Sequence, residues 1–229
     1  MSEHIQKLFD SIAPQYDLLN SLLSFQVDRR WRRQGMKEFS DSKKFQKILD
    51  LCAGTLALSK TLLETNPMTQ ITAVDFSENM LKKGEALLTP EERKQIQIQI
   101  GDILALDIPR SSYDGAMVAY GMRNVGDNPL ALQNIYEWLK PGGRLVVLEF
   151  FKPTELLPKL FNITYAEVVI PVLGSLVSKN KSAYEHLRDS VRKFYTTEEY
   201  RKLLEQTGFK NIKITAQTGG ISHLIVADK

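Results

Sequence analysis

The sequence contains little cysteine and little histidine. Among its 229 residues there is one cysteine, Cys52, which excludes an internal disulfide framework and a cysteine-based zinc site. The three histidines, His4, His186 and His223, lie too far apart to give the H-x-x-x-H spacing of a helical metal site. The sequence therefore predicts no structural metal.

A strong excess of one charge sign is also absent. The 30 Lys+Arg residues nearly balance the 27 Asp+Glu residues, which leaves a formal net charge of +3. Such a small and evenly spread charge does not indicate a nucleic-acid partner. Hydrophobic residues make up 43% of the chain, enough for a core, and this excludes intrinsic disorder. The length predicts one domain with room for a small subdomain.

Long hydrophobic segments are rare. Residues 1–20 are charged throughout and lack the apolar segment of a secretory signal, so we expect a cytoplasmic protein. The one long apolar run, 160–177, carries a single charge at Glu167 and is interrupted by Pro171 and Gly174. Its length is marginal for a membrane span, and a carboxylate inside a membrane is costly. We predict a pair of short helices there, either buried or facing lipid.

Strand-like and helix-like patterns alternate along most of the chain. The short strand segments are apolar enough to be buried on both faces, which is typical of a mostly parallel sheet covered by helices. The expected strands are 47–52, 71–75, 95–100, 113–120 and 144–150. Two later strands around Thr218-Gly219-Gly220 read as a hairpin that adds to the sheet edge, one of them antiparallel. We expect residues 1–45 to form a helical cap and residues 46–229 to form the main domain.

Acidic residues lie at the ends of three of these strands. The glycine-containing segment Asp50–Thr55 ends the first strand and enters a helix, Asp75 ends the second, and Gly101-Asp102 ends the third. Since the carboxyl ends of parallel strands meet at one edge, this is where a ligand binds in such a sheet. An acid at position 75 can accept hydrogen bonds from ribose hydroxyls, and one at position 102 from an adenine amine. The plainer interpretations are an ordinary strand–helix turn, a helix N-terminal acid and a solvated turn acid.

Seven segments carry a more specific signal. They are 8–33, 48–55 (ILDLCAGT), 74–81 (VDFSENML), 120–125 (YGMRNV), 149–153 (EFFKP), 183–194 and 218–224 (TGGISHL). In this order they resemble the successive signatures of the ubiquinone/menaquinone biosynthesis C-methyltransferases, over nearly the whole chain. The resemblance implies a class I S-adenosylmethionine-dependent methyltransferase. The implied fold is α/β and Rossmann-like: a seven-stranded, mostly parallel sheet with helices on both faces, one antiparallel late strand and the N-terminal helical cap.

The resemblance also implies a cofactor site and a substrate lid. S-adenosylmethionine is expected to contact Thr55, Asp75, Asp102 and Ile103, and the same strand ends add Asp50, Gly54 and Phe76 to the expected cofactor-binding residues. The lid is expected as an insertion at about 152–195.

One departure from the family pattern lies in the first turn. The family usually has G-T-G-D there, whereas this chain has Gly54-Thr55-Leu56-Ala57. Loss of a carboxylate that faces the cofactor's ammonium group would cost on the order of 1.5–3 kcal/mol, or roughly 10- to 100-fold in affinity. Either another residue compensates, or the protein is a weak enzyme or a non-catalytic scaffold of quinone biosynthesis. A smaller departure is His186, where the family tends to have tyrosine.

The chemistry implied by the resemblance is methylation of a ring carbon in a prenylated quinol. A ring carbon becomes nucleophilic when an adjacent hydroxyl loses its proton. Arg123 and Asn124 follow the fourth strand, and we expect Arg123 to stabilise the developing phenolate. The alternative is that Arg123 is a structural ion-pair partner. Its guanidinium is too basic to act as the base.

Two further segments are expected to close over the substrate. Tyr16 and Asp17 lie in the N-terminal segment, and Tyr184 and His186 lie in a second one. Tyr16, Asp17, Arg123 and Tyr184 are the expected substrate-binding residues, and Arg123, Asn124, Tyr184 and His186 the expected catalytic ones. The unperturbed pKa of an imidazole, about 6.5, suits proton transfer and makes His186 a candidate base, although a single histidine on a helix is more often structural.

The prenyl tail gives the apolar run 160–177 a role. We expect it to line a tail groove or to dip into the membrane surface, which would make the protein peripheral at the inner face of the membrane. The arginines at 29, 30, 32 and 33 flank Trp31 and can meet anionic headgroups, unless Trp31 packs inward on a solvated helix. An NAD-dependent oxidoreductase is disfavoured because the first turn lacks G-x-G-x-x-G. The sequence leaves open a naphthoquinol or a benzoquinol ring, and a homo-oligomer; we favour demethylmenaquinol.

Overall fold

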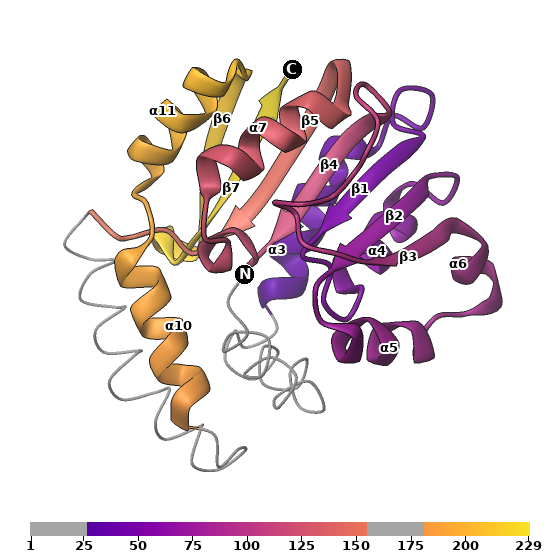
Figure 1. The fold of residues 1–229 in the computed structure, drawn as a ribbon, viewed down its shortest axis with the longest axis horizontal. Helices are drawn as coiled ribbons and strands as arrows, with labels where there is room; N and C mark the ends of the chain where they lie inside the picture. Colours follow the sequence, from indigo (N-terminus) through magenta and orange to yellow (C-terminus); the bar gives the residue numbers. More distant parts are fainter. Residues whose placement is uncertain (1–26, 155–180) are drawn as a thin grey trace.

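The computed structural model describes residues 27–154 and 181–229 (Figure 1). Tyr16, Asp17 and the apolar run 160–177 lie outside the described residues, and the side chain of Tyr184 does as well.

Seven strands form a single sheet in the order β3-β2-β1-β4-β5-β7-β6. β7 runs antiparallel to both of its neighbours, and the other pairs are parallel, which confirms the predicted fold class. The strands are β1 Lys47–Leu51, β2 Gln70–Asp75, β3 Ile96–Ile100, β4 Tyr113–Ala119, β5 Leu139–Glu149, β6 Lys210–Gln217 and β7 Ser222–Asp228. β5 begins earlier than predicted, because the turn containing Gly142 (φ 76°) is paired as an irregular extension where the β4–β5 register shifts.

The helices begin and end where local chemistry dictates. Thr89 and Thr196 each form a capping box, with Glu92 and Glu199 respectively, and Ser77 caps its helix by accepting a hydrogen bond from the Met80 N–H. The helices are α3 Val27–Met36, α4 Ala57–Thr65, α5 Glu78–Ala86, α6 Pro90–Gln95, α7 Asn128–Trp138, α10 Lys181–Lys193 and α11 Thr197–Thr207. Short 3-10 turns are η2 Lys37–Phe39, η3 Met122–Asn124 and η5 Thr218–Gly220.

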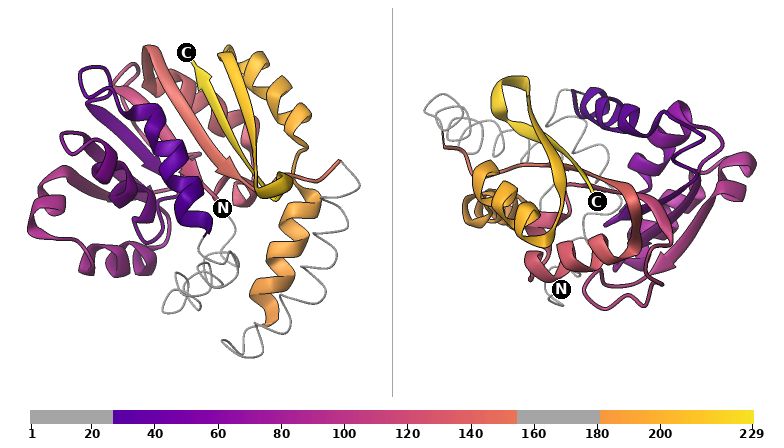
Figure 2. Two further views of the ribbon diagram at one scale, coloured as in Figure 1. Left: turned by 180° about the vertical axis from the view of Figure 1, so that it is seen from behind. Right: turned by 90° about the horizontal axis from the view of Figure 1, so that it is seen from above.

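The sheet separates two hydrophobic layers. One layer packs β-strand side chains against α7 and α11, and the other packs them against α3, α4 and α5. Figures 1 and 2 show these two groups of helices on opposite faces of the sheet. α10 extends beyond the edge at which the parallel strands end (Figure 1). This arrangement leaves that edge lined by loops, with α3 on one side and α10 on another.

α3 is part of the core as well as of the surface. It packs against α4 and β5, and Trp31 is 3% exposed, with its Nε1–H donating to Thr218 Oγ1 at 3.0 Å. Trp31 therefore packs inward, which is the alternative that the sequence left open. Arg33 lies on the outer face, where it pairs with Glu64. Within the described residues, we find no helix with the length and apolar character needed to cross a membrane.

Candidate active site

Asp75, the last residue of β2, holds the turn that follows β1 through a hydrogen bond. Its Oδ2 accepts a hydrogen bond from the Gly54 N–H at 2.9 Å, and its Oδ1 accepts one from the Ser77 N–H at 2.8 Å. Gly54 has a φ of 52°, a conformation that glycine adopts without strain. The carboxylate is 6% exposed, and the two oxygens of a carboxylate can together accept up to about four hydrogen bonds. The structure thus brings two of the predicted cofactor residues into direct contact.

A small pocket lies beside this junction. It is lined by Leu51, Cys52, Val74, Asp75, Phe76, Gly101, Asp102 and Ile103, so it unites four of the predicted residues. Asp102 turns back on its own loop, where its Oδ1 accepts the Leu104 N–H at 3.0 Å. Acids at the ends of two neighbouring strands can bind the hydroxyl and amine groups of a nucleoside. The residues present therefore fit the adenosyl part of S-adenosylmethionine.

Asp50 lies below the first turn rather than at its tip. It is 1% exposed and accepts two hydrogen bonds from Ser59, from the N–H at 3.1 Å and from Oγ at 2.6 Å. Burial raises the pKa of Asp50 to about 7, although the Ser59 hydrogen bonds oppose that shift. Asp50 therefore ties the end of β1 to α4 and supports the turn that carries Gly54 and Thr55.

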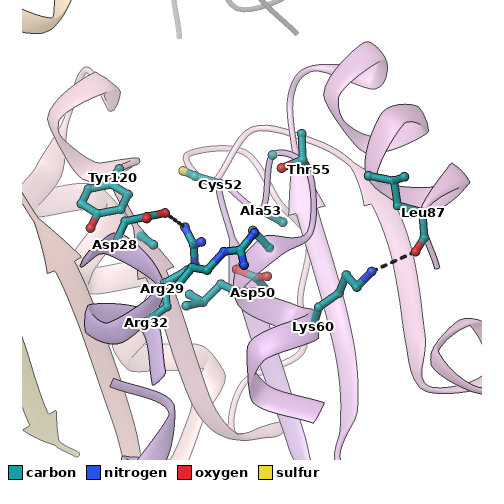
Figure 3. Close-up of a pocket in the computed structure, with 14 residues that line it drawn as sticks. Asp28, Arg29, Arg32, Asp50, Cys52, Ala53, Thr55, Lys60, Leu87 and Tyr120 are labelled. Carbon is teal, nitrogen blue, oxygen red and sulfur yellow. Dashed lines mark hydrogen bonds and ion pairs between the residues drawn. The ribbon is translucent and has the colours of Figure 1, made fainter. Parts of the chain in front are cut away.

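A larger pocket of about 280 Å³ opens on the other side of the first turn (Figure 3). The first turn, the end of β4 at Tyr120 and the helix α3 all line it. Its charged lining residues are Asp28, Arg29, Arg32, Asp50 and Lys60. Asp28 pairs with Arg32 at 2.8 Å, and Lys60 donates to the carbonyl of Leu87 at 2.9 Å.

Leu56 does not obstruct either pocket. It lines neither of them and is 0% exposed, and its side chain lies in the core layer beside α5. Its backbone has a φ of 63°, the left-handed conformation that a glycine would adopt at lower cost. Ala57, by contrast, does line the larger pocket. Leu56 therefore takes no space from either pocket, and Ala57 brings no charge to the wall of the larger one.

Arg123 lies in a buried ion pair. Its Nη1 is 2.7 Å from Glu149 Oε1, and the two side chains are 8% and 0% exposed. The same Nη1 donates to the Tyr120 carbonyl at 2.5 Å, and the Arg123 N–H donates to Glu149 Oε2 at 3.2 Å. This is the ion-pair arrangement that the sequence left open as the alternative to a phenolate contact. It fixes η3 to the end of β5.

Asn124 and His186 come together although they lie far apart in the sequence. His186 Nε2 is 2.9 Å from Asn124 Oδ1, and the contact joins η3 to α10. Asn124 is buried and His186 is partly buried. Because an amide oxygen only accepts hydrogen bonds, this contact favours the tautomer that carries its proton on Nε2 and the lone pair on Nδ1. Two predicted catalytic residues thus form one unit beyond the end of β4.

The sequence interpretation missed four residues of this region. Asp28, Arg29 and Arg32 line the larger pocket, whereas the arginines had been considered for lipid headgroups. Glu149 was quoted as part of a motif but not as the partner of Arg123. The sequence did offer one sign that Asp28 and Arg32 act together. Their i, i+4 spacing places both on one helix face, where they can form an ion pair.

The sheet order and the acids at neighbouring strand ends define a class I S-adenosylmethionine-dependent methyltransferase. The chain belongs to the ubiE/COQ5 methyltransferase family, whose model matches residues 1–229. It is 35% identical over 224 residues to the demethylmenaquinone methyltransferase of Staphylococcus aureus strain JH9, covering 96% of this chain and 90% of that protein. No finding favours the non-catalytic scaffold.

Solved structures share the fold at lower identity. Human N-acetylserotonin methyltransferase, solved in complex with SAM, superposes with a TM-score of 0.65 at 23% identity, over 96% of this chain and 56% of that one. A SAM-dependent methyltransferase from Thermotoga maritima, described as a possible histamine N-methyltransferase, gives a TM-score of 0.64 at 17% identity, over 97% and 99%.

Proposed function

We propose that this protein methylates a ring carbon of demethylmenaquinol, the reduced form of the quinone. The observation that carries the proposal is the 35% identity, over 96% of this chain, to a protein named demethylmenaquinone methyltransferase. The unit formed by Asn124 and His186 at the end of β4 supports it, because a proton acceptor is needed beside the ring.

The cofactor, when bound, supplies an electrophilic methyl group on a sulfonium. Asp75 and Asp102 would hold its adenosyl part at the ends of β2 and β3. The chain's remaining task is to make the ring carbon nucleophilic, which requires removal of a proton from the adjacent quinol hydroxyl. His186 accepts that proton at Nδ1, while Asn124 holds the ring in the tautomer that leaves the lone pair there.

Arg123 acts in this proposal as a positioning residue. Its guanidinium is engaged by Glu149 and by the Tyr120 carbonyl, so it fixes the turn that presents Asn124. Tyr16, Asp17 and Tyr184 remain proposed substrate contacts on the basis of the family resemblance.

A prenylated quinol also implies a route from the membrane. We propose that the run 160–177 receives the hydrocarbon tail and that the protein works at the membrane surface. The supporting argument is energetic, since each buried CH₂ of a tail contributes about 0.8 kcal/mol.

Labelled S-adenosylmethionine and purified protein provide the direct test. Short-tailed demethylmenaquinol is compared with a matching benzoquinol, and the oxidised demethylmenaquinone serves as the matched control. We expect label in the naphthoquinol ring, little in the benzoquinol and none in the oxidised quinone. Preferential labelling of the benzoquinol would overturn the substrate assignment. Cofactor binding without transfer to either quinol would instead support the scaffold alternative.

A further inference from the structure

The sheet order indicates where each part of the cofactor lies. Asp102 and Asp75 follow β3 and β2, and the next strands across the sheet are β1 and β4. A ligand whose nucleoside lies over the first two strands extends over the second two, since neighbouring strands are about 4.8 Å apart. The larger pocket is lined by the loop after β1 and by Ala119 and Tyr120 at the end of β4. It is therefore the place for the amino-acid end of the cofactor.

That end carries one ammonium and one carboxylate group, and both need partners. Ala57 lines the pocket but has no charge to offer the ammonium. Asp50 is buried below the turn and already accepts two hydrogen bonds from Ser59. Lys60 is engaged with the Leu87 carbonyl across the pocket wall. The loops and α4 thus leave the charge requirement of a zwitterion largely unmet.

α3 presents both signs of charge to this pocket. Asp28 is 5% exposed and is held by Arg32, whose side chain is 15% exposed. The buried Nε of Arg32 has no hydrogen-bond partner within the described residues. Arg29 also lines the pocket, and Figure 3 shows both arginine side chains between Asp28 and the Cys52–Ala53 segment. An orphaned buried donor beside a second arginine is the kind of arrangement that carboxylates complete.

We propose that α3 binds the amino-acid end of S-adenosylmethionine, with Arg29 and Arg32 on its carboxylate and Asp28 on its ammonium. The helix then supplies the charge that Ala57 does not. The inference rests on the methyltransferase assignment and is independent of which quinol is methylated. It also explains why the change at position 57 is compatible with an active enzyme.

Calorimetric titration with three ligands tests the proposal without using turnover. S-adenosylhomocysteine has both charged groups, decarboxylated S-adenosylmethionine lacks the carboxylate, and 5′-methylthioadenosine lacks both. Arg29→Gln should lower the affinity for S-adenosylhomocysteine by about 10-fold or more, because a charge-assisted hydrogen bond to the carboxylate is lost. It should change binding of the other two ligands less than about 2-fold. Asp28→Asn should lower the affinity for the two ligands that carry the amine, S-adenosylhomocysteine and decarboxylated S-adenosylmethionine. The affinity for 5′-methylthioadenosine should stay the same.

Arg33→Gln is the matched control, because Arg33 lies on the same helix but pairs with Glu64 away from the pocket. It should bind all three ligands as the wild type does. Circular dichroism and the unfolding midpoint establish that each variant is folded, and Arg29 is exposed enough for its variant to fold. Equal losses for all three ligands, or no loss with Arg29→Gln, would overturn the proposal. A wild-type protein that binds none of the ligands would overturn the methyltransferase assignment itself.

Discussion

Leu56 occupies the space that Gly84 leaves open between the first turn and α5. A Cβ added at Gly84 would lie 2.8 Å from Leu56 Cγ and 2.6 Å from the carbonyl carbon and oxygen of Thr55. The bulky residue in the turn is therefore accommodated by a small residue on the facing helix. Because this side chain is directed into the core, it takes no space from either pocket.

Gly84→Ala should destabilise the protein by about 1–3 kcal/mol, because the new methyl group meets backbone rather than a movable side chain. It should also lower the affinity for S-adenosylhomocysteine, since the backbone of Thr55 must shift. Urea denaturation and calorimetry measure the two effects. Gly126→Ala is the control, because a Cβ there meets nothing within 4 Å. Equal stability of the two variants would mean that Leu56 and Gly84 are not packed as described.

Leu56→Gly restores the residue that the family usually has, yet we expect it to lower stability. The left-handed conformation costs leucine about 1–2 kcal/mol, which glycine would recover. Removing a fully buried leucine costs about 2–5 kcal/mol. The net loss in the free energy of unfolding should be about 0–4 kcal/mol, measured by urea denaturation. A variant more stable than the wild type would show that the backbone strain at position 56 costs more free energy than the packing of the leucine side chain contributes.

The ion pair of Arg123 and Glu149 should dominate the effect of mutations at the end of β4. Arg123→Ala leaves a fully buried carboxylate without its counter-charge, so we expect a loss of about 3–5 kcal/mol. The double variant Arg123→Met with Glu149→Gln removes both charges and should recover most of that stability. A double-mutant cycle in urea gives the coupling free energy. Additive losses would argue that Arg123 acts on substrate rather than through Glu149.

The elements and the acids of the site could be predicted because they depend on local pattern and on chain order. Alternating strand-like and helix-like patterns predict a parallel sheet. Because the carboxyl ends of its strands share one edge, Asp75 and Asp102 lie together there. Ser77 was identifiable as a helix cap by the same local chemistry. These features need no knowledge of which helix covers which loop.

The remaining site residues depend on tertiary packing. Glu149 meets Arg123 across 26 positions because β5 lies beside β4, and no local period encodes that pairing. The charges of α3 reach the larger pocket because the helix packs on α4 and β5. The direction of the Leu56 side chain follows from Gly84 on another helix. A motif comparison detects the change at position 56 but not the space that receives it.

The contact of Asn124 with His186 should matter for turnover and not for cofactor affinity. His186→Ala should lower kcat by about 10²- to 10⁴-fold, as expected for loss of a general base, with binding of S-adenosylhomocysteine within about 2-fold. Asn124→Ala should lower kcat less and shift its pH profile, because the tautomer is no longer fixed. Lys193→Gln, exposed on the same helix, is the control. Unchanged kcat in His186→Ala would assign the histidine a structural role.

Asp50 should make the stability of the unliganded protein depend on pH in an unusual direction for a carboxylate. Its pKa is raised from 3.8 to about 7 in the folded state, so between these values the native state holds a proton that the unfolded state has lost. Its contribution to the free energy of unfolding therefore falls as pH rises through this window, and is constant below about pH 4 and above about pH 7. The full fall is on the order of 4 kcal/mol.

Asp50→Asn isolates this effect, because its other titrating groups are those of the wild type. The difference in free energy of unfolding, wild type minus variant, should decrease between pH 4.5 and pH 8 in urea denaturation. Ser59→Ala should extend the decrease to higher pH, since it removes a hydrogen bond that favours the charged form and so raises the pKa of Asp50 further. A difference that is flat or rises with pH would mean that Asp50 is ionised in the folded protein. The carboxylate below the first turn would then carry a full negative charge at the wall of the larger pocket at neutral pH.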